Sequence, residues 1–262
     1  HLPTMAGDAS STLLPALLLA GAAVAGVGGF ALAPRWAAWR RARLSASPFP
    51  AAWRRILRRH VPIVARLPAD LQLRLKRHVQ GFIGDKAFIG CAGQPITDEV
   101  RVTIAAQACL LLLGHEHTDV FPGLRQVLVY PSAFAVRREL PAGDGLVRET
   151  RQVMTGESWS QGQVVLAWDE VLAGAAQPED GRNVVVHEFA HQVDQDKGHA
   201  DGRPWRPGAA ARARWARVMD EGLARLRHAP SELVDGYGAT SPAEYFAVVC
   251  EVFFERPQAL RD

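Results

Sequence analysis

The sequence has few cysteines and lacks the basic surface pattern of a nucleic-acid-binding protein. Cys91, Cys109 and Cys250 are the three thiols in 262 residues. Their odd number and wide spacing exclude a disulfide framework, and their apolar neighbours predict buried free thiols in a reducing compartment. The net charge is only +3, and the arginines are spread out without a basic stripe of interleaved aromatics. We therefore expect no nucleic-acid partner.

Internal repeats and low-complexity tracts are also absent, apart from one long apolar segment near the N-terminus. With 48% apolar residues, the chain can form one globular domain with a sizeable core and an appendage. The first four residues precede Met5 and are treated as a non-native addition. We predict an N-terminal segment at 1–12, a transmembrane helix at 13–33, a basic linker at 34–50 and the globular domain at 51–262.

The segment 13–33 contains no charged or hydrogen-bonding side chain, and its 21 residues match the roughly 20 that span a bilayer. Basic residues and tryptophans follow it at Arg35, Trp36, Trp39, Arg40, Arg41 and Arg43. The positive-inside rule then predicts a single-pass inner-membrane anchor with the following domain in the cytoplasm. A cleaved signal peptide is disfavoured because the positive charge follows the apolar run. A soluble cytoplasmic protein is the alternative.

Hydrophobic periodicity predicts helices in the first half of the globular domain. Apolar residues recur at helical spacing through residues 51–80, and a short strand is expected around Phe82, Phe88 and Ile89. Thr97 is expected to cap a buried helix that continues to Leu113. The first half of the domain is therefore predicted to contain both helices and at least one strand.

Extended and helical segments alternate further along the chain. Strands are predicted at 127–131 and at 158–168, where Val164, Leu166 and Trp168 alternate with Gln163, Val165 and Ala167. From Gly181 to the end the pattern is helical, with a polar loop at 196–208. The predicted class is α+β: helices packed on a small mixed sheet, followed by a helical C-terminal half.

The helical C-terminal half carries a metal-ligand pattern, His187-Glu188-Phe189-Ala190-His191. Residues at i and i+4 of a helix share a face, so both imidazoles can bind one zinc ion. Glu188, one step round the helix, is placed to accept a proton from a zinc-bound water as that water attacks a peptide carbonyl. Apolar residues in and before the motif bury this helix, which argues against a solvated polar face. The sequence predicts one Zn²⁺ per chain and a zinc metallopeptidase domain at 51–262.

A hydrolytic zinc site needs a third protein ligand, and the extended histidine form of the motif is absent. A later helix offers carboxylates instead. Ser241 and Pro242 form a strong helix start, and Glu244 and Glu251 lie seven residues apart on one buried face. We predict Glu244 as the ligand, with a helix-capping role as the competing interpretation. The active-site helix with this glutamate gives a gluzincin-like ligand set.

Several separate segments, in a fixed order over residues 50–262, are shared with one known family. They are Thr103–Leu110, Val129-Tyr130-Pro131, Gly156–Trp159, His187–Asp194, Asp235-Gly236-Tyr237 and Ser241–Val248. Together they resemble the Mlc titration factor A (MtfA) family of zinc-dependent peptidases.

This resemblance implies a zincin-like metallopeptidase domain, with a catalytic core similar to the anthrax lethal factor protease domain. It implies His187, His191 and Glu244 as metal ligands and Glu188 as catalytic base. It adds Tyr237, whose phenol is expected to donate a hydrogen bond to the oxyanion. Packing of this aromatic on the core is the competing role. The best-known member of the family is a soluble cytoplasmic protein that binds the glucose repressor Mlc and shows aminopeptidase activity on small peptides.

The expected function is hydrolysis of peptide or protein substrates, aminopeptidase-like on small peptides. The alternative is a regulatory protein that sequesters a transcriptional repressor and has weak peptidase activity. A third hypothesis is a membrane-tethered scaffold with structural zinc. Glu188 argues against the scaffold, because structural zinc needs no water-activating carboxylate.

Three further features of the sequence bear on metal binding and on substrate binding. Asp194, one turn beyond His191, is expected either to orient a ligand imidazole or to cap the helix. The strand at 163–168 is a candidate sheet edge for binding substrate backbone. His115-Glu116-His117 offers two imidazoles in one polar turn but no third ligand, so we do not expect a second metal site there.

Overall fold

The structure is a computed structural model, and it places the globular domain but little of what precedes it. It describes residues 39, 43, 44, 46–114, 121–142, 146–154, 156–159, 162–195, 199–204 and 208–261, with side chains described outside 134–161. The transmembrane helix predicted at 13–33, most of the linker and the 115–117 turn lie outside the described residues. Within the described ranges, no helix combines the length and the apolar character needed to cross a bilayer.

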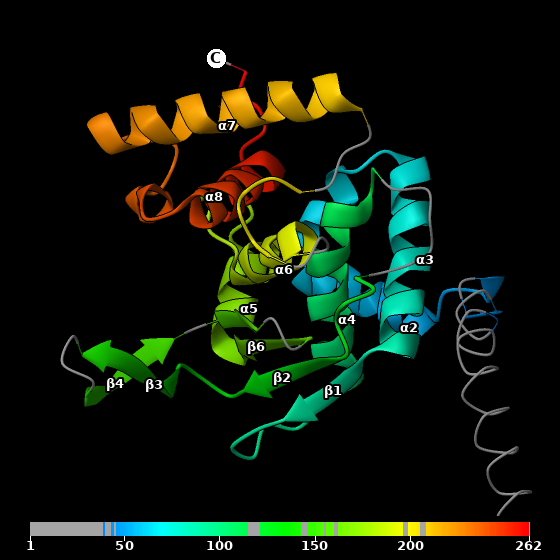
Figure 1. Cartoon of the computed structure of the whole chain (residues 1–262). Helices are drawn as coiled ribbons and strands as arrows, with labels where there is room; N and C mark the ends of the chain where they lie inside the picture. Colours follow the sequence, from blue (N-terminus) through cyan, green and yellow to red (C-terminus); the bar gives the residue numbers. More distant parts are fainter. Residues whose placement is uncertain are drawn as a thin grey trace, which may run out of the picture.

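A four-stranded mixed sheet, in the order β1-β2-β6-β5, forms the base of the domain (Figure 1). Strands β1 (Ala87–Gly90), β2 (Gln126–Tyr130) and β6 (Gln163–Ala167) are parallel, and β5 (Gly156–Trp159) runs antiparallel to β6. Val127 of β2 pairs with the β-branched Val164 of β6, and both are fully buried. Such side chains suit the pleated, buried surface of a central strand.

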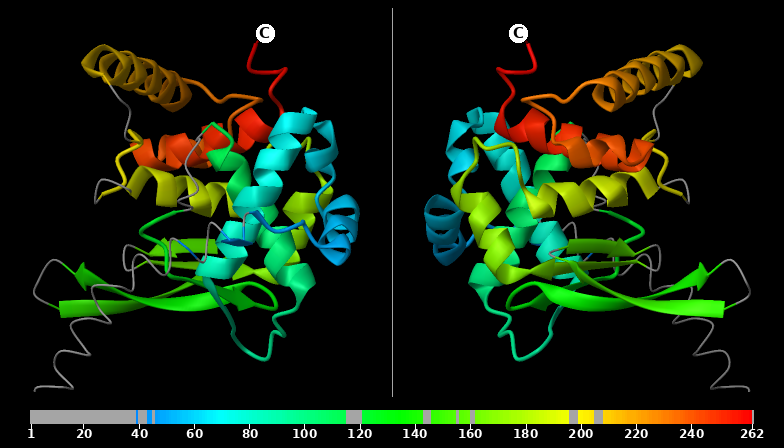
Figure 2. Two further views of the ribbon diagram at one scale, coloured as in Figure 1. Left: turned by 90° about the vertical axis from the view of Figure 1, so that its right-hand side faces the viewer. Right: turned by 90° about the vertical axis from the view of Figure 1, so that its left-hand side faces the viewer.

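The helices lie over one side of this sheet in successive layers (Figure 2). Helix α6 (Val184–Asp194) lies between the sheet and α8 (Pro242–Glu255), and the long α7 (Ala209–His228) covers α8 from outside. Gly222 allows the close approach of α7, because a Cβ there would lie 2.0 Å from the Tyr245 hydroxyl oxygen. The layering buries α6 on its sheet side and on its α8 side.

Aromatic rings anchor α6 in the main core. Phe189 of α6 is fully buried, with its ring centroid 4.9 Å from that of Phe121 and 5.6 Å from that of Phe82. Apolar side chains from α4 (Asp98–Ala108) and from the central strands complete the same cluster. The core therefore fixes one face of α6 and leaves the opposite face toward α8.

Two predictions for the first half of the domain need correction. The single helical stretch at 51–80 is divided into α2 (Ala51–His60), a 3-10 turn at Pro62–Arg66 and α3 (Ala69–Asp85). Pro62 and Pro68 cause the breaks, since proline lacks the N–H of a helix interior and disfavours helical backbone before it. Phe82 was expected in a strand, but it lies in α3, and the strand begins after it at Ala87.

The capped helix and the strand at 127–131 are confirmed with small changes. Thr97 accepts the backbone N–H of Val100 at 3.4 Å, and α4 is buried along most of its length before a 3-10 turn at Cys109–Leu112. The segment 158–168 is not one strand. It contains the antiparallel pair β5 and β6, and Trp168 begins α5 (Trp168–Ala176).

Strand β6 is not the edge that its sequence was expected to provide. It lies between β2 and β5, so β5 is the edge strand at this end of the sheet. A two-stranded hairpin of β3 (Phe134–Ala142) and β4 (Leu146–Met154) was not predicted and projects beside the sheet (Figure 1). The α+β class, with helices on a small mixed sheet and a helical C-terminal half, is confirmed.

The three cysteines, all of them described, form no disulfide, as expected, but they differ in burial. Cys109 is fully buried, whereas Cys91 and Cys250 are partly exposed. The prediction of burial is therefore wrong for two of the three, because an apolar sequence context does not say which side of a helix or strand a residue occupies.

Candidate metal centre

Helix α6 positions the two histidines of the motif through its capped N-terminus. Asn183 is the N-cap, and its side-chain oxygen accepts the backbone N–H of Val186 at 3.0 Å. An N-cap side chain satisfies one of the free N–H groups of the first turn. The helix then places His187 and His191 one turn apart on one face, with ring centroids 5.0 Å apart. This is the arrangement that the i, i+4 spacing predicts.

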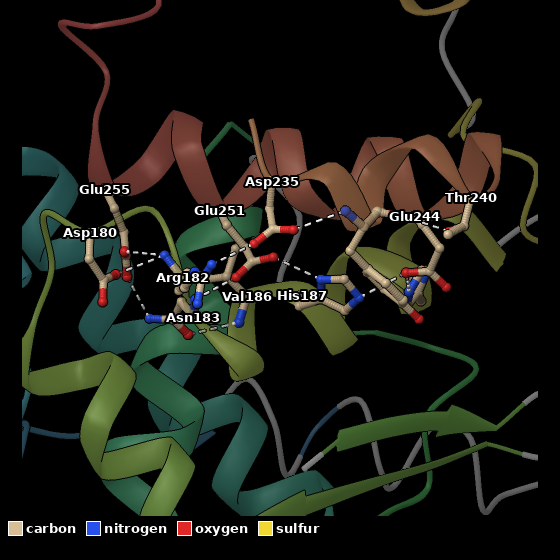
Figure 3. Close-up of polar contacts among 12 residues, drawn as sticks. Asp180, Arg182, Asn183, Val186, His187, Asp235, Thr240, Glu244, Glu251 and Glu255 are labelled. Carbon is tan, nitrogen blue, oxygen red and sulfur yellow. Dashed lines mark hydrogen bonds and ion pairs between the residues drawn. The ribbon is translucent and has the colours of Figure 1, made fainter. Parts of the chain in front are cut away.

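Helix α8 brings the glutamates to the same place from the opposite side. Ser241 caps it by accepting the backbone N–H of Glu244 at 3.2 Å, and Pro242 occupies the first helical turn, as predicted. The Glu244 side chain extends toward α6, as Figure 3 shows. One of its carboxylate oxygens lies 3.0 Å from Nε2 of His187 and 3.4 Å from Nε2 of His191.

These three residues form a group that can hold a metal ion. Ligand atoms of His187, His191 and Glu244 all lie within 4.8 Å of one another, and within the described part of the chain no other histidine, cysteine or carboxylate cluster of this kind occurs. The group is largely shielded from solvent, because His191 is buried and the other two are half-buried. The structure thus brings together the three residues that the sequence predicted as ligands.

In the metal-free protein, hydrogen bonds between the histidines and the glutamates determine the protonation states of His187 and Glu244. Burial by itself would lower the pKa of His187, but the hydrogen bonds to Glu244 and Glu251 and the charge of Glu188 outweigh it and raise that pKa to about 10. Burial would raise the pKa of Glu244, yet hydrogen bonds from both histidines lower it to about 2. A protonated His187 therefore lies between carboxylates in a place where a cation would sit.

Glu188 and Tyr237 flank this group. Glu188 is buried on α6 next to His187 but is not one of the three clustered ligands. Tyr237 lies on a 3-10 turn (Gly236–Ala239) with its ring centroid 6.1 Å from that of His187, and the residue is 54% exposed. Asp235 holds the turn by accepting the Tyr237 backbone N–H at 2.9 Å. The exposed ring disfavours the competing interpretation of a core-packed aromatic.

Two acidic residues have partners that sequence reasoning missed. Asp194 is fully buried and accepts the backbone N–H of Gly202 at 2.6 Å, which ties down the chain that follows α6. Its role beside a ligand imidazole stays a prediction. Glu251 accepts from Nδ1 of His187 at 2.8 Å. Its seven-residue spacing from Glu244 placed both on one face, and only the fold shows that they reach opposite edges of the same imidazole (Figure 3).

Comparison with known proteins gives one consistent family. The family model described as glucose-regulated metallo-peptidase M90 matches residues 36–262. An uncharacterised protein of Synechocystis sp. is 40% identical over 234 residues, which cover 87% of this chain and 84% of that protein. Mlc titration factor A of Klebsiella pneumoniae strain MGH 78578 is 34% identical over 207 residues, and that of Enterobacter sp. strain 638 is 33% identical over the same length. In both cases 76% of each chain is covered.

Proposed function

Since this chain belongs to the M90 family of glucose-regulated metallo-peptidases, we propose that it is a zinc-dependent peptidase with a zincin-like catalytic domain. The observation that carries the proposal is the convergence of His187, His191 and Glu244, with Glu188 on the same helix as the histidines. Metal binding alone would not need Glu188, so its buried position beside the ligands supports a hydrolytic role.

The donor set fits zinc. Two imidazole nitrogens and one carboxylate oxygen are a common ligand set of catalytic zinc, which leaves a fourth position open. With ligand bonds of about 2.0–2.1 Å, tetrahedral donors lie roughly 3.3 Å apart. The distances of 3.0 and 3.4 Å between the Glu244 oxygen and the two imidazole nitrogens are close to that value. Zinc, when bound, acts as a Lewis acid that lowers the pKa of a coordinated water to about 7.

Different residues of the chain would bind the metal, transfer the proton and stabilise the oxyanion. His187, His191 and Glu244 hold the ion, and the Glu188 carboxylate accepts a proton from the attacking water and returns it to the leaving amine. The Tyr237 hydroxyl donates a hydrogen bond to the oxyanion that develops on the substrate carbonyl. The exposed ring of Tyr237 beside the buried ligands supports this role. Strand β5, as the sheet edge, offers backbone groups for pairing with an extended peptide.

Zinc binding to the metal-free protein is expected to release about one proton at pH 7.5. Zinc binds neutral imidazole, whereas the pKa of His187 is raised to about 10, so this residue must lose its proton. Glu244 is already ionised, because its pKa is lowered to about 2, and it releases nothing. Zinc affinity should therefore rise with pH, by about tenfold per unit between pH 7 and 9. Calorimetric titration in two buffers of different ionisation enthalpy counts the protons, and a count of zero would contradict a protonated His187.

Removing the metal should abolish hydrolysis reversibly. We expect about one zinc per purified chain, complete loss of activity on small unblocked peptides after chelation, and recovery on addition of one equivalent of zinc. Peptides with an acetylated N-terminus are the matched substrates, and a strong preference for the unblocked series would support an aminopeptidase-like activity. Activity that survives complete chelation would refute a zinc mechanism.

A regulatory function is the second candidate, and the names of the relatives favour it. Several are Mlc titration factor A, a name that describes titration of a regulator by those proteins. We propose a transcriptional regulator as a partner of this chain in addition to peptide substrates, and no nucleic acid. A hydrolytically inactive but folded variant separates the two functions, because sequestration of a regulator needs the surface of the domain and not its chemistry.

Membrane attachment through residues 13–33 is the proposed location of the chain, with the catalytic domain on the cytoplasmic side. The apolar length of this segment and the arginines that follow it support the proposal. We expect the full chain in the membrane fraction after high-salt and alkaline washes, and a variant that begins at Pro50 in the supernatant. Recovery of the full chain without detergent would favour the soluble alternative.

A further inference from the structure

The carboxylate of Glu251 joins a ligand histidine to the start of its own helix. Its Oε1 lies 2.8 Å from Nδ1 of His187, and its Oε2 accepts the backbone N–H of Asn183. Glu251 is 7% exposed, and His187 is shielded between it and Glu244 (Figure 3). The buried Glu251 side chain thus connects His187, a proposed metal ligand, to Asn183, the N-cap of the same helix.

Asn183 is itself held firmly, so it provides a fixed point for Glu251. Its side-chain amide donates to Gln107 at 2.9 Å and to Glu255 at 3.0 Å, while its oxygen accepts from Val186. Asn183, Gln107 and Glu255 are all buried. The carboxylate of Glu251 therefore has one oxygen fixed by the backbone and the other available for His187.

We propose that Glu251 is a positioning residue that fixes the tautomer and ring direction of His187, so that Nε2 faces the metal. This inference rests on the proposed zinc site. An ionised carboxylate only accepts hydrogen bonds, so the partner nitrogen Nδ1 must carry the proton. When zinc displaces the second proton of His187, the nitrogen left free to bind it is then Nε2, which lies 3.0 Å from the Glu244 oxygen on the metal side. Partners of this kind orient ligand histidines and increase their basicity.

A glutamine at position 251 cannot replace the carboxylate in both contacts. Its side chain has one acceptor oxygen and one NH₂ group, whereas Asn183 and the required His187 tautomer both present N–H donors. If the oxygen faces Asn183, the NH₂ group faces Nδ1 and favours the tautomer with the proton on Nε2. If the oxygen faces His187, two donors meet at Asn183. In either arrangement, His187 is less well held in the tautomer and ring direction that zinc binding through Nε2 requires.

Glu255 offers a matched control on the same helix. It is buried one turn beyond Glu251 and also accepts N–H groups at the start of α6, from Gly181 and Arg182 at 3.0 Å each and from the Asn183 amide. None of these contacts involves a metal ligand. Glu255→Gln therefore disturbs the same helix start and reaches His187 only indirectly, through Asn183 and Glu251.

The test compares zinc affinity and thermal unfolding of metal-free wild type, Glu251→Gln and Glu255→Gln, with a chromogenic chelator as competitor. We expect Glu251→Gln to bind zinc about 10- to 100-fold more weakly than wild type. Glu255→Gln should lose clearly less zinc affinity than Glu251→Gln, because it reaches His187 only through Asn183 and Glu251, and thermal unfolding reports whether each variant is folded. Equal affinity in Glu251→Gln and wild type, or equal losses in both variants, would overturn the positioning role.

A measurement on the wild type covers the case in which Glu251→Gln does not fold. In the zinc-loaded protein, long-range ¹H–¹⁵N spectra should show His187 with a protonated Nδ1 that exchanges slowly with solvent and a metal-bound Nε2. Ligation through Nδ1 would overturn the inference while leaving the zinc site in place. If wild type binds no zinc, or if His187→Ala retains it, the proposed function itself fails.

Discussion

Glu188→Gln is expected to give a folded protein with wild-type zinc content and peptide hydrolysis slower by at least about 100-fold. The substitution keeps the size of the side chain and removes the group that accepts the proton from water. The residue is buried and lies outside the ligand group, so the metal should remain bound. Zinc content by mass spectrometry and initial rates on unblocked peptides measure the two effects separately.

Glu221→Gln provides the control for this change, because Glu221 is exposed on α7. It should keep both zinc and wild-type rates. Hydrolysis by Glu188→Gln within tenfold of wild type, with zinc retained, would sink the water-activating role. The same inactive protein tests the regulatory alternative: binding of a repressor with unchanged affinity would show that sequestration does not depend on catalysis.

His187→Ala should lose both zinc and activity. His187 is the central member of the metal group, with Nε2 next to Glu244 and Nδ1 next to Glu251. Without the imidazole, two largely buried carboxylates lose a hydrogen-bond partner, so we also expect the free energy of unfolding to fall by about 1–3 kcal/mol. Metal analysis should give less than about 0.1 zinc per chain, and urea denaturation measures the stability change.

The matched control is His228→Ala, which removes an exposed histidine at the end of α7. Its Nδ1 lies 2.7 Å from the carbonyl oxygen of Ala224 in its own helix, so zinc content and rates should not change. Zinc bound at one equivalent in His187→Ala would mean that the ion is held elsewhere, and the ligand assignment would then be wrong.

Local signals in the sequence were sufficient to place the ends of the important helices. Thr97, Asn183 and Ser241 each accept a backbone N–H in the first turn of a helix, and two of these caps were predicted from residue type. The i, i+4 rule likewise placed both motif histidines on one face. These features depend on a few neighbouring residues, so a sequence contains all the information they need.

Features that depend on distant parts of the chain were not predictable in the same way. The alternation at 163–167 suggests a half-buried edge, yet β6 pairs on both sides because residues 126–130 and 156–159 flank it. The bridge from Glu251 to His187 and Asn183 joins positions at least 64 residues apart, and spacing within α8 shows only that Glu251 faces inward. Pro62 and Pro68 were present in the sequence as helix-breaking residues. Because apolar residues recur at helical spacing on both sides of them, the segment 51–80 was still predicted as one helical stretch.

Because α8 packs directly on α6, the length of the chain between these two helices is not fixed by the metal site. All three proposed ligands belong to these two helices, and among the described residues between Asp194 and Pro242, α7 included, none joins the group. Doubling the length of a flexible connection costs only about 0.6 kcal/mol in closure entropy. Insertions in the exposed segment after α7, at 229–232, should therefore be tolerated, and a reporter or an additional domain can be attached there.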